Sequence, residues 1–201
     1  MESNFYAMIS RMKYIERWSL MRNSRPENVS EHTLEVSILA HALAVIGNLR
    51  LKKNLNGERA ALIALFHDST EIITGDMPTP IKYYNGNMQS AFKEIEDEAA
   101  KRLLQMLPED FKEEYETLFF QREEEVYLWK LVKAADKLSA LIKCIQEEKA
   151  GNTEFVNAKD SIAKAIAELG VEEVDIFMDE FLPSYYRNLD ELTGDTEEGP
   201  Q

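Results

Sequence analysis

The stretch AALIALFHDSTEIITGDMPTP, from Ala60 to Pro80, combines the features that decide the fold of this 201-residue chain. It opens with seven apolar residues that end at Phe66, continues with His67-Asp68, and closes on two prolines. Such an apolar run fits a buried helix, and the prolines then force the backbone out of the helical region into a rigid loop. Seven residues are far too few to span a bilayer.

Helical spacing of apolar side chains recurs along nearly the whole chain. We find no alternating strand pattern and no internal repeat, and most of the eight glycines and six prolines lie between the periodic segments. We expect Asn28 or Ser30 to cap the second helix. Helices are predicted over residues 5–15, 29–45, 57–75, 88–106, from 108, 123–148, 154–169 and 171–192, the last interrupted at Pro183. The sequence therefore predicts an all-α fold, a compact single-domain bundle over residues 1–192, followed by an acidic, disordered tail at 193–201.

The charge distribution limits the partners of the protein. The formal net charge is −14, which disfavours binding to nucleic acid polymers and to anionic membranes. Residues 1–26 nevertheless hold five basic and two acidic residues, so this segment is suited to a small anion.

The only cysteine, Cys144, excludes an internal disulfide and lies in an amphipathic pattern that favours core packing. A single cysteine and the lack of an apolar signal segment predict a cytoplasmic protein.

Two of the three histidines stand beside acidic residues, in Glu31-His32 and His67-Asp68. An imidazole next to a carboxylate at the end of a buried helix suits a divalent metal ion. The alternative is that the histidine fills the edge of the core while the aspartate faces water. The third histidine, His41, is rotated about 180° around its helix from His32. We therefore expect His41 to be a packed structural residue outside any site.

Asp136 lies inside the apolar pattern of the helix predicted over 123–148. A carboxylate at such a position is costly unless it is paired or binds a metal. The alternative is a salt bridge to Lys133 or Lys137 on the same helix. Glu71 follows His67 by four residues, so on a continuous helix it would lie on the side of the candidate metal ligands.

Arg17-Trp18 closes the first predicted helix and begins a basic loop. The guanidinium could bind a phosphate while the indole packs on a sugar or base. The alternatives are a solvated cation at a helix end for Arg17 and a core anchor for Trp18.

The order of His32, His67-Asp68 and Asp136 resembles the H…HD…D signature of the HD-domain metal-dependent phosphohydrolases. The likeness is closer to one family among them, the YfbR-type 5′-deoxynucleotidases, and it extends over about residues 5–192. The motifs that carry it are Arg17-Trp18, Leu20-Met21-Arg22-Asn23, Glu27-Asn28-Val29-Ser30-Glu31-His32, Glu71 and Thr74-Gly75-Asp76-Met77-Pro78-Thr79-Pro80. Thr33 and Ser69-Thr70 depart from the expected pattern, but they keep small hydroxyl side chains beside the expected ligands.

This resemblance implies an enzyme that hydrolyses deoxyribonucleoside 5′-monophosphates to a deoxynucleoside and phosphate, acting as a homodimer. It implies one divalent transition metal ion, and two nitrogen and two oxygen ligands do not distinguish Co, Mn, Fe, Ni and Zn. The implied metal ligands are His32, His67, Asp68 and Asp136. The implied catalytic residues are Glu71, as general base or general acid, and Arg17. The implied substrate contacts are Arg17, Trp18, His32, Asp68, Asp76, Met77, Pro78, Thr79 and Asp136.

Two other functions are compatible with the same residues. Another HD-domain phosphohydrolase could act on nucleoside triphosphates, cyclic dinucleotides or alarmones, but these larger anions would require more basic residues than the first 26 positions offer. A non-catalytic nucleotide sensor would keep the fold and the metal, yet it would have no need for a water-activating acid such as Glu71.

Overall fold

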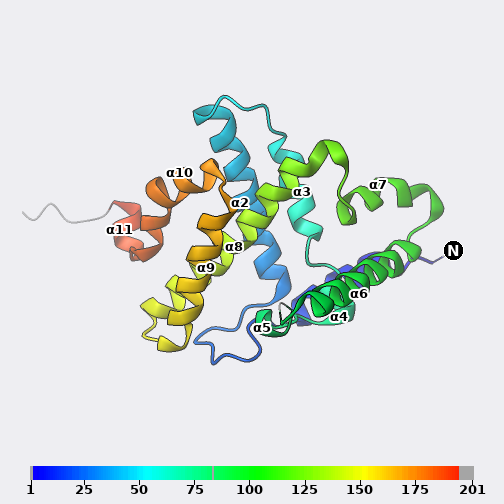
Figure 1. Ribbon diagram of the computed structural model, residues 1–201, viewed down its shortest axis with the longest axis horizontal. Helices are drawn as coiled ribbons and strands as arrows, with labels where there is room; N and C mark the ends of the chain where they lie inside the picture. The colour runs from blue at the N-terminus through cyan, green and yellow to red at the C-terminus, as the bar shows by residue number, and fades with distance from the viewer. Residues whose placement is uncertain (1, 83, 195–201) are drawn as a thin grey trace, which may run out of the picture.

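The computed structural model describes residues 2–82 and 84–194, and this part of the chain contains helices and no strand. Two long helices, α2 and α8, run through the middle of the molecule, and the shorter helices surround them (Figure 1). The all-α prediction is confirmed. The α-helices are α1 (Phe5–Ile9), α2 (Val29–Arg50), α3 (Gly57–Phe66), α4 (Glu71–Thr74), α5 (Thr79–Lys82), α6 (Gly86–Gln105), α7 (Glu109–Phe119), α8 (Val126–Lys149), α9 (Val156–Leu169), α10 (Glu172–Glu180) and α11 (Leu189–Thr193). Four 3-10 helices, η1 (Ser10–Tyr14), η2 (Glu123–Glu125), η3 (Thr153–Phe155) and η4 (Leu182–Tyr186), connect them.

The main core lies where α2, α3, α8 and α10 meet. Its fully buried side chains include Leu43 of α2, Ile63 of α3 and Leu138 of α8. A smaller core joins α1 to α6 and is centred on Phe5 and Leu103. This packing fixes the N-terminal half of α2, the end of α3 and the middle of α8 relative to one another.

Several predicted boundaries need correction. The first predicted helix divides into α1 and η1, and it ends before Arg17-Trp18, which lie in the following loop. The helix α2 extends five residues beyond its predicted end, and its cap is Asn28, whose side chain accepts a hydrogen bond from the Glu31 N–H at 3.1 Å. The break at Pro183 is confirmed, because η4 separates α10 from α11. Of the expected tail, residues 195–201 lie outside the described residues.

The helix predicted over 57–75 is also interrupted, because α3 ends at Phe66 and α4 begins at Glu71. Two side chains compete for the carbonyl groups that would continue the helix. His67 Nδ1 donates to the Ala64 carbonyl at 2.7 Å, and Ser69 Oγ donates to the Phe66 carbonyl at 2.7 Å. The resulting turn carries the His-Asp pair.

The helix α2 is long and apolar enough to cross a membrane, but 56% of its 18-residue apolar window is buried inside the protein. That burial is what the central helix of a helical domain requires.

Candidate metal centre

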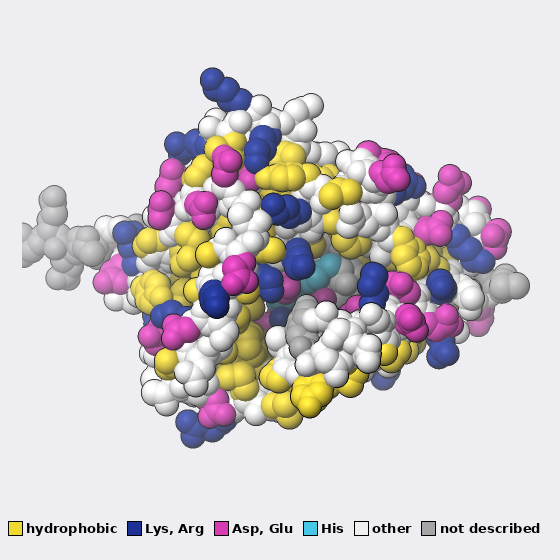
Figure 2. All heavy atoms as spheres, in the orientation of Figure 1, with side chains coloured by type: hydrophobic (Ala, Val, Ile, Leu, Met, Phe, Trp, Pro, Cys, Tyr) yellow, Lys and Arg dark blue, Asp and Glu magenta, His cyan; other side chains and the backbone are white. Residues whose placement is uncertain are grey.

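The four expected metal ligands come from three helices that meet at one point. His32 lies in the first turns of α2, His67 and Asp68 follow the end of α3, and Asp136 lies midway along α8. One ligand atom from each residue lies within 4.8 Å of the other three. Figure 2 shows a histidine side chain in a hollow near the middle of one face, with Lys and Arg side chains around it. The structure thus brings together residues that are up to 104 positions apart.

The distances within the cluster suit a shared cation. His32 Nε2 lies 3.1 Å from Asp136 Oδ1 and 3.4 Å from Asp68 Oδ2. His67 Nε2 lies 3.2 Å from the same Asp68 oxygen. No ion pair joins Asp136 to Lys133 or Lys137 in the described part of the chain, so the salt-bridge alternative is wrong.

The ring of His67 is oriented for metal binding. A backbone carbonyl only accepts hydrogen bonds, so the bond to Ala64 keeps a proton on Nδ1 and directs Nε2 towards the cluster. Burial disfavours the charged ring, but Asp68 outweighs burial and raises the pKa of His67; a bound dication would replace any proton on Nε2 and take its lone pair. This Nε2 atom is buried and has no hydrogen-bond partner among the described residues. A divalent cation among the four residues would satisfy this nitrogen and the facing carboxylates, so the residues fit the expected metal.

His32 is held from behind by two residues to which the sequence assigned no role. Ser139 Oγ donates to Glu35 Oε2 at 2.5 Å, and it lies 3.1 Å from His32 Nδ1. Because the hydroxyl proton is committed to Glu35, Ser139 accepts the Nδ1 proton, and Nε2 faces the cluster with its lone pair. Burial, and secondarily the Arg17 charge, lowers the pKa of His32 to about 4, which keeps the ring neutral. Glu35 and Ser139 each follow a ligand by three residues, a spacing that could have indicated them.

The two aspartates are ionised at neutral pH. Burial opposes the charge of Asp136, but in acid the His32 ring becomes protonated and its Nε2 donates to Asp136 Oδ1, which outweighs burial and lowers the pKa of Asp136 to about 2. Burial likewise opposes the charge of Asp68, whose pKa is held well below its usual value by His67, His32 and Arg17. Two neutral imidazoles and two carboxylates would neutralise a dication.

Arg17 reaches the cluster from the loop that precedes α2. Its Nε donates to Glu27 Oε1 at 3.0 Å, and its Nη1 donates to Asp68 Oδ2 at 3.2 Å. Only 12% of its side chain is exposed, so the alternative of a solvated cation is wrong. Burial disfavours its charge, but Asp68, Asp136 and Glu27 raise the pKa of Arg17 above its ordinary value. A permanent cation therefore lies beside the candidate metal position.

Trp18 has a left-handed backbone, with φ at 60°. For a bulky residue this conformation costs about 1–3 kcal/mol and persists only where the surroundings hold it. The Trp18 N–H donates to Asp76 Oδ2 at 3.2 Å, and the indole packs against Phe155 with ring centroids 5.2 Å apart. The indole Nε1 is buried without a hydrogen-bond partner among the described residues.

Glu71 and the following loop line the same region. Glu71 is only 8% exposed, and its Oε2 has no hydrogen-bond partner within residues 2–82 and 84–194. Burial, with the neighbouring Asp68 and Asp76, raises the pKa of Glu71 to about 9. Gly75, at φ 73°, then turns the chain towards Asp76. Of the other expected loop contacts, Met77 and Pro78 are half-buried, and Thr79 is exposed at the start of α5.

Two predictions outside the cluster have different outcomes. Cys144 is fully buried in α8, as expected. His41 is exposed, and the prediction of a packed residue is wrong. Its side of α2 is opposite His32, as the helical rotation requires, and the start of α3 near Gly57 approaches the ring without burying it.

Comparison with known proteins decides the family. The family model described as 5′-deoxynucleotidase YfbR-like matches residues 4–185. The chain belongs to the YfbR-like family. Among its relatives, a 5′-deoxynucleotidase from Erwinia tasmaniensis is 47% identical over 191 residues, which cover 95% of this chain and 96% of the relative. A 5′-deoxynucleotidase from Pectobacterium atrosepticum is 48% identical over 198 residues, with 97% and 98% covered.

Solved structures support the fold of this YfbR-like protein. An HD-domain phosphohydrolase from Listeria innocua superposes with a TM-score of 0.80 at 23% identity, covering 96% of each chain. A cyanophage S-2L HD phosphohydrolase, bound to dA and one catalytic Zn²⁺ ion, gives a TM-score of 0.53 at 20% identity, covering 97% of this chain and 95% of that one. At these identities the likeness concerns the HD-domain fold.

Proposed function

We propose that this protein is a metal-dependent phosphomonoesterase that hydrolyses deoxyribonucleoside 5′-monophosphates. Water adds to phosphorus, the bond between phosphorus and O5′ breaks, and O5′ takes up a proton, which gives a deoxynucleoside and inorganic phosphate. The observation that carries this proposal is the convergence of four ligand atoms within 4.8 Å in a member of a 5′-deoxynucleotidase family.

His32, His67, Asp68 and Asp136 would hold one divalent transition metal ion, one of Co, Mn, Fe, Ni or Zn. When bound, such an ion lowers the pKa of its water and polarises the phosphate. Since the two aspartates neutralise the dication, a phosphate dianion needs another positive partner. Arg17 is that partner in our proposal, because its buried guanidinium already lies 3.2 Å from Asp68.

Glu71 is proposed as the group that exchanges a proton during the reaction. General acid–base catalysis requires a group whose pKa lies near the working pH. Burial beside two aspartates raises the pKa of Glu71 to about 9, and a nearby dication would lower it again towards neutral pH. Glu71 would accept the proton of the attacking water or deliver one to O5′.

Selection of deoxyribose is assigned to Trp18. A bulky indole fixed beside C2′ would leave no room for a hydroxyl group, which excludes ribonucleotides by steric conflict. Asp76 holds the Trp18 backbone in place, and Met77, Pro78 and Thr79 continue the proposed substrate loop. His32, Asp68 and Asp136 would meet the substrate through its phosphate.

A substrate panel tests the proposal. Chelator-stripped protein would be reloaded with each metal and offered deoxyribo- and ribonucleoside monophosphates, nucleoside triphosphates, cyclic dinucleotides and alarmones, with phosphate release as the readout for the monophosphates. We expect release from deoxyribonucleoside monophosphates above all others. Turnover confined to one of the larger nucleotides would establish the other phosphohydrolase function. Metal binding without any turnover would establish a sensor.

We further propose that the protein acts as a homodimer in the cytoplasm. Four apolar side chains with helical spacing form an exposed stripe on α2. They are Leu34, Ile38, Val45 and Leu49, with 57%, 62%, 37% and 75% exposed. Such a stripe is suited to a second copy of the chain. Light scattering on wild-type protein and Ile38→Asp tests this, and a wild-type monomer at assay concentration would contradict it.

A further inference from the structure

The proposed phosphate-binding and sugar-selecting residues lie on one loop, residues 15–28. Its base is closed by two backbone hydrogen bonds, from Val29 N to the Ile15 carbonyl and from Arg17 N to the Glu27 carbonyl, each 2.9 Å long. The loop crosses the lower end of the molecule between η1 and α2 (Figure 1). These two hydrogen bonds do not fix the distal part of the loop, residues 18–26, so its position depends on other contacts.

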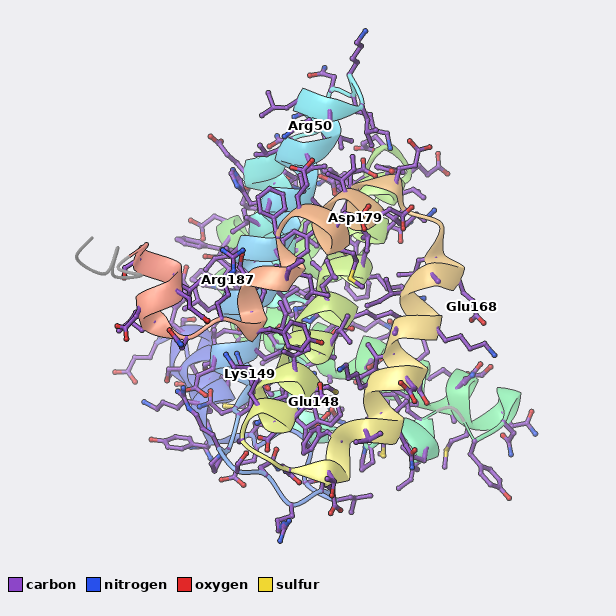
Figure 3. The ribbon with its side chains drawn as sticks, turned by 90° about the vertical axis from the view of Figure 1, so that its left-hand side faces the viewer. Arg50, Glu148, Lys149, Glu168, Asp179 and Arg187 are labelled. Atoms are coloured by element: carbon purple, nitrogen blue, oxygen red, sulfur yellow. The ribbon has the colours of Figure 1, made fainter. Side chains whose placement is uncertain are left out.

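The distal part is held by a buried polar cluster at the C-terminal end of α8. We call Lys143, Glu147 and Asn152 the anchor cluster; they are 5%, 1% and 6% exposed. Lys143 Nζ donates to Glu147 Oε1 at 2.5 Å, and Asn152 Nδ2 donates to Glu147 Oε2 at 2.8 Å. In Figure 3, the neighbouring Glu148 and Lys149 mark this end of α8, with the blue loop below it.

Each member of the anchor cluster binds the loop. Glu147 Oε2 accepts hydrogen bonds from the Ser24 hydroxyl and from the Ser24 backbone N–H, the latter at 2.9 Å. Lys143 Nζ donates to the Arg25 carbonyl at 2.6 Å. Asn152 Nδ2 donates to the Arg22 carbonyl at 2.7 Å. Polar side chains of the anchor cluster thus hold the backbone at three positions of the loop, Arg22, Ser24 and Arg25.

Two connections lead from the anchored segment to Trp18. Asn23, between the anchored positions, donates its Nδ2 to the Trp18 carbonyl at 3.3 Å. Phe155, on which the indole packs, follows Asn152 by three residues, and Lys143 Nζ lies 5.7 Å from the centre of the Phe155 ring. Because the left-handed backbone of Trp18 persists only where surrounding contacts fix it, these connections bear directly on the indole.

The anchor cluster is separate from the metal ligands. Lys143 and Glu147 follow Asp136 by seven and eleven residues on α8, which places them about 10 and 16 Å along the helix axis. A buried ion pair can often be replaced by apolar residues without loss of stability, so stability alone does not require one here.

We propose that Lys143, Glu147 and Asn152 are positioning residues that hold the 15–28 loop so that Arg17 and Trp18 face the metal centre. The inference rests on the proposed function for the roles of Arg17 and Trp18. The anchor residues act through the loop backbone and through Asn23 and Phe155, and they touch neither substrate nor metal.

Glu147→Gln tests the proposal, and the chain offers a matched control. Glu173 is likewise fully buried, and it accepts hydrogen bonds from Lys53 at 2.9 Å and from Tyr127 at 2.9 Å. Glu173 and Tyr127 thereby hold Lys53, which follows the C-terminal end of α2, whereas His32 lies near the N-terminal end of that helix. Both substitutions neutralise a buried carboxylate that is paired with a lysine, although Lys53 is 30% exposed, and only Glu147→Gln loosens the 15–28 loop.

With a deoxyribonucleoside monophosphate, we expect Glu147→Gln to lower kcat/KM by about 10- to 100-fold, since a small misplacement of a binding group has effects of this size. Preference for deoxyribose should fall as well, while metal content is retained. Glu173→Gln should remain within about 2-fold of wild type. Equal effects of the two substitutions would overturn the proposal. If Glu147→Gln does not fold, Asn152→Ala keeps the ion pair and is expected to lower kcat/KM by about 10-fold.

Hydrogen exchange gives a readout that does not depend on the substrate. The Arg17 and Ser24 amides should exchange faster in Glu147→Gln than in wild type or Glu173→Gln. Unchanged exchange would refute the anchoring role even in an active enzyme. Conversely, the wild-type protein could be inactive on the whole substrate panel while the loop still exchanges faster in Glu147→Gln. That result would refute the proposed function and leave the anchoring role intact.

Discussion

Replacement of Ser139 by alanine tests how the metal centre is organised. The Ser139 hydroxyl gives its proton to Glu35 and lies 3.1 Å from His32 Nδ1, so it fixes which ring nitrogen carries the proton. In Ser139→Ala, Nδ1 keeps Glu27 Oε1 at 3.5 Å, which is too far for a good hydrogen bond. The ring then loses its preference for presenting a bare Nε2 to the metal.

The size of the effect follows from one lost hydrogen bond. Residues that orient a metal-bound histidine are typically worth about 10- to 100-fold in metal affinity. Because a weaker contact to Glu27 remains, we expect the lower value, about 10-fold, which corresponds to about 1.4 kcal/mol. At saturating metal, kcat should stay close to wild type, because Ser139 touches no reacting group.

The assay is competition for the metal between the protein and a chromogenic chelator. Ser37→Ala is the matched control. Ser37, on α2, is buried like Ser139, and its hydroxyl donates to the Ala61 carbonyl at 2.8 Å, away from the metal ligands' nitrogen and oxygen atoms. Nitrogen chemical shifts of the three histidine rings report the His32 tautomer directly. A metal affinity of Ser139→Ala within about 2-fold of wild type, or an equal loss in Ser37→Ala, would refute the reasoning.

Three further substitutions have defined outcomes. Arg17→Ala should lose about 10²- to 10³-fold in kcat/KM with metal content retained, and activity within a few-fold of wild type would show that Arg17 does not bind the phosphate. Trp18→Ala should raise ribonucleotide turnover relative to deoxyribonucleotide turnover by about 10-fold, measured on paired substrates; an unchanged ratio would assign the selectivity elsewhere. Glu71→Gln should abolish most turnover yet stabilise the metal-free protein at pH 8. The raised folded-state pKa of Glu71 means that stability falls as pH rises from its ordinary value of 4.5 towards about 9, a penalty on the order of 3 kcal/mol at neutral pH that glutamine removes. Thermal denaturation at pH 5 and pH 8 measures this, and an equal effect at both values would contradict it.

The sequence predicted the helical fold because the apolar spacing is regular and glycine and proline mark the breaks. It could not predict the break between α3 and α4. There, the side chains of His67 and Ser69 take the carbonyl groups of residues 64 and 66, and nothing in the hydrophobic pattern records that competition. The hydrogen bond from His67 to the Ala64 carbonyl also orients the His67 ring, so the break between α3 and α4 is part of the candidate metal centre.

The four cluster residues could be selected from the sequence because carboxylates and histidines stand out in apolar helices. Helical spacing points to Glu35 and Ser139 at most, and the sequence assigns no role to the residues that orient the metal ligands or hold the 15–28 loop. Glu35, Ser139 and Glu147 are ordinary polar residues at helical positions, and their importance arises from contacts across 104 to 123 positions of the chain. The error at His41 has a related cause, because rotation around a helix gives the side on which a residue lies but not what covers it.

The central claim is that one dication, held by His32, His67, Asp68 and Asp136, is required for hydrolysis of a deoxyribonucleoside monophosphate. The most direct measurement is titration of metal into chelator-stripped protein while phosphate release is followed. Our account predicts no release from the stripped protein and a rise in rate that ends at one ion per chain. Full activity without metal, or no activity with any metal at saturation, would contradict it.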